Sequence, residues 1–277
     1  MEFEVEKTVR TRKSVRAYEN RPLSDEDRDR LKERIASLGM GGEPFPAQMR
    51  VHLLEAKPGT DTEKLGTYGV IRGAKSFLCV TVKNTEDAME AVGYHFEKLV
   101  LAATDMGLGT CWLAGTFNRG QFSDAMKLKE DEIFPIACPI GYPAEKQTVV
   151  NSLFRKTSKS DQRRPWGELF FENSFGTPLT EERAGEYAYP LEMLRLAPSA
   201  ANRQPWRIVR KDGAFHFFRE GKGRGPYDLQ RLDVGIGACH FHLAAEERGL
   251  GGGFVRCSDP GIAAPENVKY LFSWEIG

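Results

Sequence analysis

The sequence predicts an α+β fold made of two related halves, each a sheet flanked by helices. Three observations predict it: an internal repeat at an offset of 142 residues, the same order of elements in both halves, and complementary differences between them. A length of 277 residues also suits two fused units better than one. We therefore expect two degenerate repeats in one chain.

The repeat is clearest where residues 92–109 align with residues 234–251, because eight of eighteen positions are identical. In both segments apolar residues recur at helical spacing, which predicts two long, largely buried helices. Gly107 and Gly249 follow as stop signals, since glycine favours the left-handed backbone that ends a helix.

An earlier helix is predicted in each half from a hydroxyl residue followed by acidic residues. Ser24 in the first half corresponds to Thr180 in the second, and either side chain can cap the first turn of a helix. Leu31, Ile35 and Leu38 then fall on one face of the first-half helix.

The strands are predicted from short runs of β-branched, aromatic and other apolar residues. In order, they are residues 50–54, 77–82 and 136–141, matched by 207–209, 215–218 and 272–277. Each half therefore reads helix, strand, strand, long helix, strand.

Residues 149–164 are polar and basic, and we interpret them as a segment that crosses between the halves. The second half begins near Pro165. We thus place the first half at residues 1–164 and the second at residues 165–277.

Composition argues against several classes of protein. Thirty-nine basic residues balance thirty-nine acidic ones, so no overall field favours nucleic acid or an anionic membrane. No apolar run approaches the ~20 residues of a membrane span, and the N-terminus lacks a secretion signal, so we expect a cytoplasmic protein. Five cysteines without a CxxC pair are expected to be reduced core residues.

The halves differ first in a basic cluster near the start of the chain. Arg12, Lys13, Ser14 and Arg16 offer three cations and a hydroxyl, whereas residues 168–172 in the second half offer none of these cations. Guanidinium forks and a short hydroxyl suit the oxygens of a phosphate. A solvated basic face is the alternative, and the spacing leaves both open.

The second difference is a polar turn that only the second half carries. Residues 196–206 contain Pro198, Ser199, Asn202 and Gln204, whereas residues 41–49 of the first half have no such hydroxyl and amide pair. Short donors and acceptors on a rigid turn suit the polar edge of a flat heterocycle. A simple capped loop is the alternative.

Four segments together resemble the signatures of the nitroreductase family: residues 12–16, 107–115, 139–143 and 197–206. The resemblance covers nearly the whole chain and implies an FMN-binding, nitroreductase-like α+β fold. Members usually form homodimers with each flavin at the interface between protomers.

The order of the motifs departs from the usual family pattern, because Pro198 lies 186 positions after Arg12, in the other half. The chain therefore resembles a subgroup of nitroreductases in which one polypeptide imitates the dimer. One ancestral flavin site should survive and the other should be lost, which implies one FMN per chain.

The resemblance also implies roles for the residues of the basic cluster. Arg12 and Ser14 would hold the phosphate or ribityl end of FMN, with Lys13 between them. Arg16 would lie near the pyrimidine edge of the ring as the catalytic cation. A fixed positive charge there stabilises the negative charge that the ring gains on reduction.

The same resemblance assigns cofactor contacts elsewhere in the chain. Those residues are Leu113, Ala114 and Gly115 on the N5 side of the ring; Pro198, Ser199 and Asn202 at the ring and ribityl; Gln204 as their support; and Arg163 or Arg164 at the phosphate. The choice between the two arginines stays open.

Other kinds of site find no support in the sequence. The glycine pattern at Gly235 and Gly237 does not continue as a dinucleotide-binding loop between a strand and a helix. His240 and His242 are two apart on a predicted helix and cannot chelate one metal, so we expect structural roles and no metal site. No nucleophile elbow or paired-carboxylate arrangement of a hydrolase is apparent.

We therefore expect an FMN-dependent oxidoreductase that passes hydride from NADH or NADPH to a nitroaromatic, quinone or related small acceptor. Its partners would be small-molecule substrates, and the chain would be a monomeric pseudo-dimer or a weak homo-oligomer. The alternative is a flavin-binding or flavin-free protein that keeps the fold without turnover, because half of the motifs are lost and no acid or base stands out.

Overall fold

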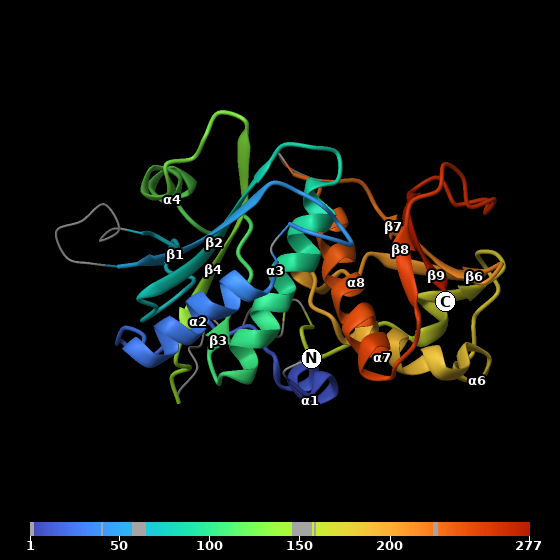
Figure 1. Cartoon of the computed structure of the whole chain (residues 1–277), viewed down its shortest axis with the longest axis horizontal. Coiled ribbons are helices and arrows are strands. Elements are labelled where there is room, and N and C mark those ends of the chain that lie inside the picture. Colours follow the sequence, from blue (N-terminus) through green and yellow to red (C-terminus); the bar gives the residue numbers. More distant parts are fainter. Residues whose placement is uncertain (1–2, 40, 57–64, 146–156, 158, 224–226) are drawn as a thin grey trace.

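Two sheets lie at opposite ends of the molecule, and two long helices pack side by side between them (Figure 1). The computed structural model describes residues 3–39, 41–56, 65–145, 157, 159–223 and 227–277. Residues 149–156 and 158 of the expected crossing segment lie outside this described part.

The first sheet has the strand order β1-β2-β4-β3, with every neighbouring pair antiparallel. Its strands are β1 (Met49–Glu55), β2 (Ser76–Lys83), β3 (Gly109–Thr110) and β4 (Glu132–Gly141). The central strand β2 is buried along nearly its whole length, as its continuous apolar run predicts.

The second sheet repeats this order as β6-β7-β9-β8 and adds β5 parallel to β6 at one edge. Its strands are β5 (Phe170–Glu172), β6 (Trp206–Lys211), β7 (Ala214–Glu220), β8 (Gly252–Val255) and β9 (Val268–Ile276). The shared order confirms the α+β fold with two repeats. Each expected strand is present, and the short strands β3 and β8 follow the long helices.

The long helices are α3 (Ala88–Asp105) and α8 (Leu229–Glu247), the two aligned segments of the repeat. They meet at Gly93 and Gly235, which occupy equivalent positions in the repeat. A Cβ added at Gly93 would lie 2.1 Å from the Leu232 carbonyl oxygen, and one at Gly235 would lie 2.3 Å from the Glu90 carbonyl oxygen. Only glycine permits this reciprocal backbone contact.

Both long helices end as the glycines predict. Gly107 and Gly249 have φ angles of 78° and 66°, in the left-handed region. The amide of the following leucine then donates to a carbonyl of the last helical turn, at 2.9 Å in both halves.

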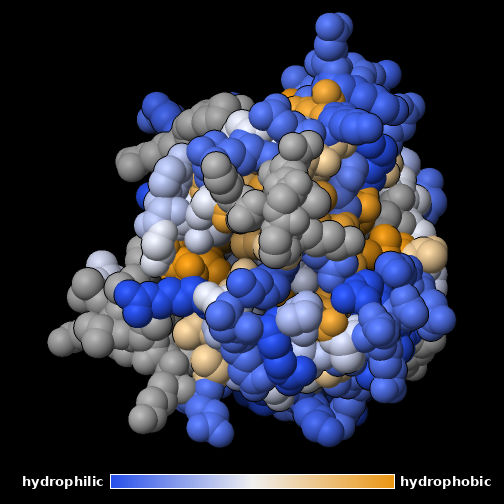
Figure 2. All heavy atoms as spheres, turned by 90° about the vertical axis from the view of Figure 1, so that its left-hand side faces the viewer, coloured by the Kyte–Doolittle hydropathy of each residue, from blue (hydrophilic) through white to orange (hydrophobic). Residues whose placement is uncertain are grey.

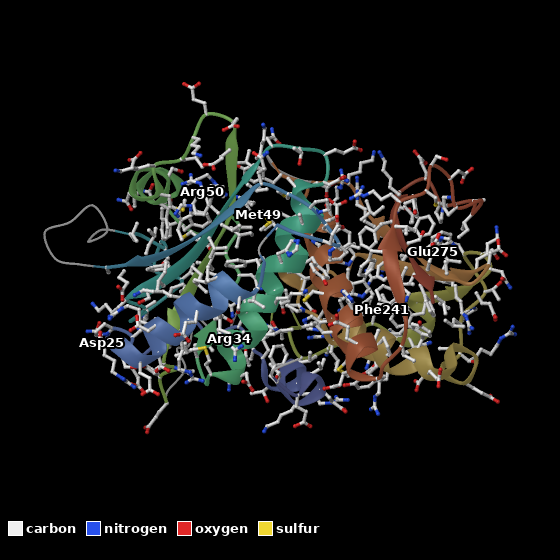
Figure 3. The ribbon with its side chains drawn as sticks, in the orientation of Figure 1. Asp25, Arg34, Met49, Arg50, Phe241 and Glu275 are labelled. Carbon is white, nitrogen blue, oxygen red and sulfur yellow. The ribbon has the colours of Figure 1, made fainter. Side chains whose placement is uncertain are left out.

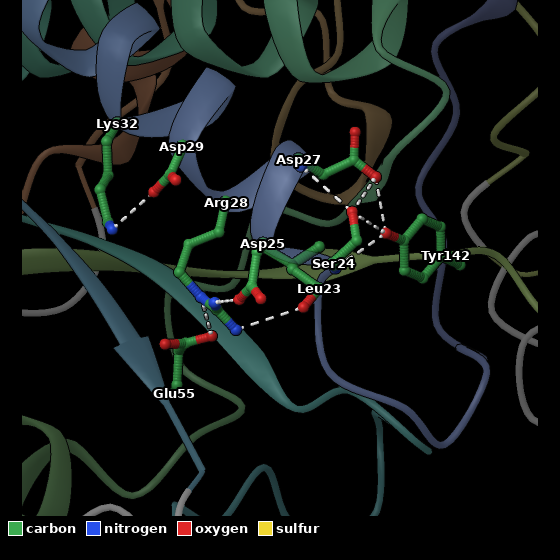
Figure 4. Close-up of polar contacts among 9 residues, drawn as sticks. All are labelled: Leu23, Ser24, Asp25, Asp27, Arg28, Asp29, Lys32, Glu55 and Tyr142. Carbon is green, nitrogen blue, oxygen red and sulfur yellow. Dashed lines mark hydrogen bonds and ion pairs between the residues drawn. The ribbon is translucent and has the colours of Figure 1, made fainter.

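Helix α2 (Asp25–Ser37) begins at the predicted cap (Figure 4). The Ser24 hydroxyl accepts the Asp27 amide at 3.1 Å, and Tyr142, just after β4, donates to the Asp27 carboxylate at 2.6 Å. Arg28 donates to Glu55 at the end of β1 at 3.0 Å. These contacts fix α2 against the first sheet.

The remaining helical segments include those that lead into the candidate site. They are α1 (Val5–Thr11), α4 (Arg119–Met126), η1 (Trp166–Glu168), α6 (Glu181–Ala184), η2 (Gly185–Tyr187), α7 (Ala188–Leu196) and η3 (Ala200–Asn202). Thr180 caps α6 by accepting the Arg183 amide at 3.2 Å, as expected.

An aromatic core joins α8 to the second sheet. Phe241 is fully buried between them (Figure 3), and its ring contacts Tyr187, Phe215 and Phe217. Such rings bury large apolar areas, which stabilises the second half as a packed unit.

The cysteines follow expectation except at one position. Four are buried thiols, whereas Cys257 is exposed in the loop between β8 and β9. The number and spacing of the cysteines in the sequence do not indicate which of them lie in the core and which in a loop.

The outer face of the first half is mainly hydrophilic, with small hydrophobic areas between the polar side chains (Figure 2). Among the described residues, no helix combines the length and apolar character that a membrane crossing requires.

Candidate cofactor site

A pocket of about 350 Å³ lies between the basic cluster of the first half, the crossing segment and the end of α7 in the second half. Residues from three segments line it: Val9, Arg10, Thr11, Arg12, Lys13, Ser14 and Arg16 from α1 and the chain after it, Ser160, Asp161 and Arg163 from the crossing segment, and Leu196 from the end of α7.

The basic cluster follows α1 as extended chain along β3. Ser14 pairs with Thr110 in a parallel bridge, and the Val15 amide donates to the Thr110 carbonyl at 2.8 Å. Val15 is buried in the core, so the alternation of extended chain turns Ser14 and Arg16 the other way. Burial raises the pKa of the Cys111 thiol, and the nearby charge of Arg16 opposes this rise.

Arg163 connects the pocket to the second half. Its guanidinium donates to the carbonyls of Leu196 and Ser160, both at 2.9 Å, and lies 3.5 Å from the Asn202 side-chain oxygen. Burial lowers the pKa of Arg163 to about 10, and the positive charge of Arg12 adds to this effect. Two guanidinium groups from different parts of the chain therefore repel each other here.

Both of these arginines have a buried nitrogen with no hydrogen-bond partner among the described residues. The atoms are Arg12 Nη1 and Arg163 Nε. Buried donors are normally satisfied, so each of these two nitrogens lacks a partner that a ligand could supply. The chemistry of the pocket therefore fits an anion such as a phosphate, which would accept from both groups.

Arg164 lies elsewhere, although it is adjacent in sequence. It lines a separate pocket of about 440 Å³, and its guanidinium is 3.7 Å from Glu220 and 4.0 Å from Glu168. Its backbone amide donates to the side chain of Gln204 at 2.8 Å. Arg163, not Arg164, faces the first pocket.

The polar turn of residues 196–206 is held in an unusual backbone conformation. Ala201, Asn202 and Gln204 have φ angles of 51°, 53° and 51°, in the left-handed region that non-glycine residues seldom adopt. Such conformations cost of order 1–3 kcal/mol each and cluster at functional sites. Surrounding contacts must therefore hold this turn in place.

The contacts that hold the turn come from within it, from α8 and from the crossing segment. The Ser199 hydroxyl accepts the Gln204 amide at 2.9 Å, and both side-chain oxygens of Asp233 accept the Ala200 amide at 3.1 Å. The Asn202 side chain donates to the carbonyls of Lys159 and Gln162, at 2.7 and 3.0 Å. The turn thus adjoins the crossing segment that lines the pocket.

The segment of Leu113, Ala114 and Gly115 continues from the strand beside Ser14. Leu113 exchanges two backbone hydrogen bonds with Ala137 and is buried. Arg119 donates to the Ala114 carbonyl at 2.8 Å. Gly115 is exposed, and a Cβ there would meet open space.

The structure thus brings Arg12, Lys13, Ser14, Arg16 and Arg163 to one pocket. Asn202 adjoins it through Arg163, and Gln204 bonds to Asn202. The residues outside its lining are Leu113, Ala114, Gly115, Arg164, Pro198, Ser199, Asn202 and Gln204.

The equivalent place in the opposite repeat is filled by an aromatic side chain. The first-half segment 41–49, which corresponds to the polar turn, carries Phe45, whose ring centroid lies 4.9 to 5.2 Å from those of Tyr94, Phe254 and Phe272. Phe45 is buried, so this position forms core.

Sequence reasoning expected a structural role for His240 but missed its buried partner between the halves, Glu97. Glu97 on α3 and His240 on α8 are both fully buried and bond to each other at 2.9 Å. Trp112 donates to Glu97 at 2.9 Å, and His240 also contacts the Met193 carbonyl at 3.1 Å. The available signal was an acidic residue, Glu97, in the middle of a largely apolar helix.

The comparisons with known proteins agree with this fold. Residues 4–245 match the family model described as "Putative TM nitroreductase". No curated protein gives a significant match.

Among solved structures, the chain is similar to a "putative nitroreductase" from Thermotoga maritima MSB8, with 21% identity and a TM-score of 0.61, over 100% of this chain and 95% of that one. A nitroreductase family protein from Clostridium difficile 630 has 19% identity and a TM-score of 0.44, over 61% of this chain and 96% of that one. An FMN-dependent nitroreductase from Clostridium difficile R20291 has 14% identity and a TM-score of 0.40, over 51% of this chain and 88% of that one.

Proposed function

The chain belongs to the family described as "Putative TM nitroreductase", and on this premise we propose that it is an oxidoreductase that binds one FMN between its two halves. The observation that carries the proposal is the pair of buried, unpartnered donors on Arg12 and Arg163. A phosphate between them would attract both guanidinium groups and so offset their mutual repulsion.

In this proposal Arg12, Lys13, Ser14 and Arg163 hold the phosphate or ribityl end, because all four line the pocket. The position of Arg163 supports choosing it over Arg164, whose guanidinium lies near two glutamates.

The ring would then extend toward the polar turn and the Leu113 segment. Pro198, Ser199 and Asn202 would contact the ring and ribityl, with Gln204 supporting the turn. The left-handed backbone of this turn supports a functional role, because strained conformations of this kind cluster at functional sites. Ala114 and Gly115 would offer their backbone on the opposite side.

When bound, FMN would supply a two-electron carrier between NADH or NADPH and a nitroaromatic, quinone or related small acceptor. Arg16 would place a fixed positive charge where negative charge collects on reduction. No dedicated acid or base is needed for this part of the chemistry.

The binding claim is tested by titrating the purified chain with FMN and following the flavin fluorescence. We expect Arg163→Ala to weaken FMN binding by about tenfold or more, because a charge-assisted hydrogen bond contributes ~1.5–3 kcal/mol. Arg164→Ala is the matched control and should bind like the wild type. Equal losses in both variants would contradict the assignment.

Turnover is tested with the FMN-loaded chain under anaerobic conditions. Addition of NADH or NADPH should bleach the flavin absorbance, and a quinone should restore it. Tight binding without bleaching would instead support the non-catalytic flavin-binding alternative.

A further inference from the structure

Arg119, the first residue of α4, lies among three aromatic rings. Its guanidinium carbon is 4.8 Å from the ring centroid of Phe117, 5.5 Å from that of Phe134 and 5.1 Å from that of Tyr227. Phe117 and Phe134 belong to the first half, whereas Tyr227 precedes α8 in the second. The side chain therefore lies where the two halves meet.

No carboxylate of the described residues pairs with Arg119, and its Nη1 is buried without a hydrogen-bond partner among them. Burial lowers the pKa of this guanidinium. Cation–π contacts offset part of the free energy that is lost when the guanidinium leaves water. A half-buried cation without an anion still favours negative charge nearby.

The second terminal nitrogen of the guanidinium donates a hydrogen bond to a backbone carbonyl. Arg119 Nη2 donates to the Ala114 carbonyl at 2.8 Å. The C=O and N–H of a trans peptide point in opposite directions, so the Gly115 amide is directed away from Arg119. Gly115 is exposed, and no described residue accepts its N–H.

We propose that Arg119 is a positioning residue that orients the Ala114–Gly115 peptide and polarises it toward a bound flavin. A cation on the carbonyl strengthens the donor at the other end of the same peptide, because linked hydrogen bonds polarise one another. Arg119 then favours the reduced, more negative flavin over the oxidised one. This inference rests on the proposed function, since it requires the ring of a bound FMN to reach Gly115.

The repeat supports a single site of this kind. Helix α4 lies between β3 and β4, whereas residues 256–267, between β8 and β9, form no helix. The second half therefore has no counterpart of Arg119.

The test is the midpoint potential of the bound flavin in Arg119 variants, measured by dithionite reduction against a reference dye. We expect Arg119→Met to bind reduced flavin about tenfold less tightly relative to oxidised flavin. This change corresponds to a midpoint potential ~30 mV lower than that of the wild type. Arg119→Gln can still bond to Ala114 but lacks the charge, so its potential should fall similarly. Arg119→Lys keeps the charge and should remain near the wild type.

Arg30→Met, on the surface of α2, is the control and should leave the potential unchanged. If Arg119→Met does not fold, Arg119→Gln decides the question. Wild-type potentials in both neutral variants, with FMN bound, would overturn the role of Arg119 and leave the proposed function standing. Failure of the wild-type chain to bind FMN would overturn both.

Discussion

Arg12 and Arg16 belong to one short extended segment, yet their surroundings imply different tasks. Arg12 has a buried donor beside Arg163, whereas Arg16 is the arginine whose charge lowers the pKa of the Cys111 thiol more strongly. The first environment suits a phosphate, and the second lies nearer the strand that leads to Leu113. One arginine should therefore control retention of the cofactor and the other its reactivity.

We expect Arg12→Ala to weaken FMN binding by about tenfold, because it removes a charge-assisted contact to phosphate. Arg16→Ala should chiefly lower the flavin potential and slow reduction by NADH or NADPH. Fluorescence titration and anaerobic stopped-flow absorbance measure the two effects. Equal or negligible changes in both variants would refute this division of roles.

Residue identities alone could not choose between Arg163 and Arg164. Both precede Pro165 and carry the same charge, and the difference lies in which way the backbone turns each side chain. The structure places one near Arg12 and the other near two glutamates. Arg119 was missed for a related reason, because its importance depends on contacts with Ala114 and with Tyr227 from the other half.

At the scale of elements, the expected strands and long helices are present because their signals are local. The apolar run of β2 and the glycine stops of α3 and α8 act within a few residues. Strands β3 and β8 are too short to show a pattern, and their pairing depends on β4 and β9. The polar turn was recognisable by its residues, but its left-handed backbone was not.

Helix α8 supports the polar turn through Asp233, and burial raises the pKa of this carboxyl well above its usual value. The folded state then retains a proton that the unfolded state releases above pH ~3.9. Its stabilising contribution is therefore largest at low pH and is lost as the pH rises through the folded pKa.

Asp233→Asn removes this titration. We expect the unfolding free energy of the wild type, relative to that of Asp233→Asn, to fall by up to about 1.4 kcal/mol per pH unit above pH ~4, until the folded pKa is reached. Urea denaturation at pH 5, 6 and 7 measures the difference. A difference that does not vary with pH would show that Asp233 is ionised in the folded protein.

For the whole molecule, the two repeats share a fold but differ at the sites they could form. Arg12 and Arg163 meet at a pocket on one side, whereas Phe45 packs into aromatic core at the position that corresponds to the polar turn. Because the buried Phe45 ring packs against three aromatic rings, we expect no second flavin ring at this position. The duplicated chain should therefore carry one functional site.

Equilibrium titration of the chain with FMN, with protein concentration determined independently, tests this conclusion. We predict saturation at one FMN per chain in the wild type, with binding weakened by Arg163→Ala and unchanged by Arg164→Ala. Two equivalents per chain, or one equivalent that is insensitive to Arg12 and Arg163, would contradict a single site at this pocket.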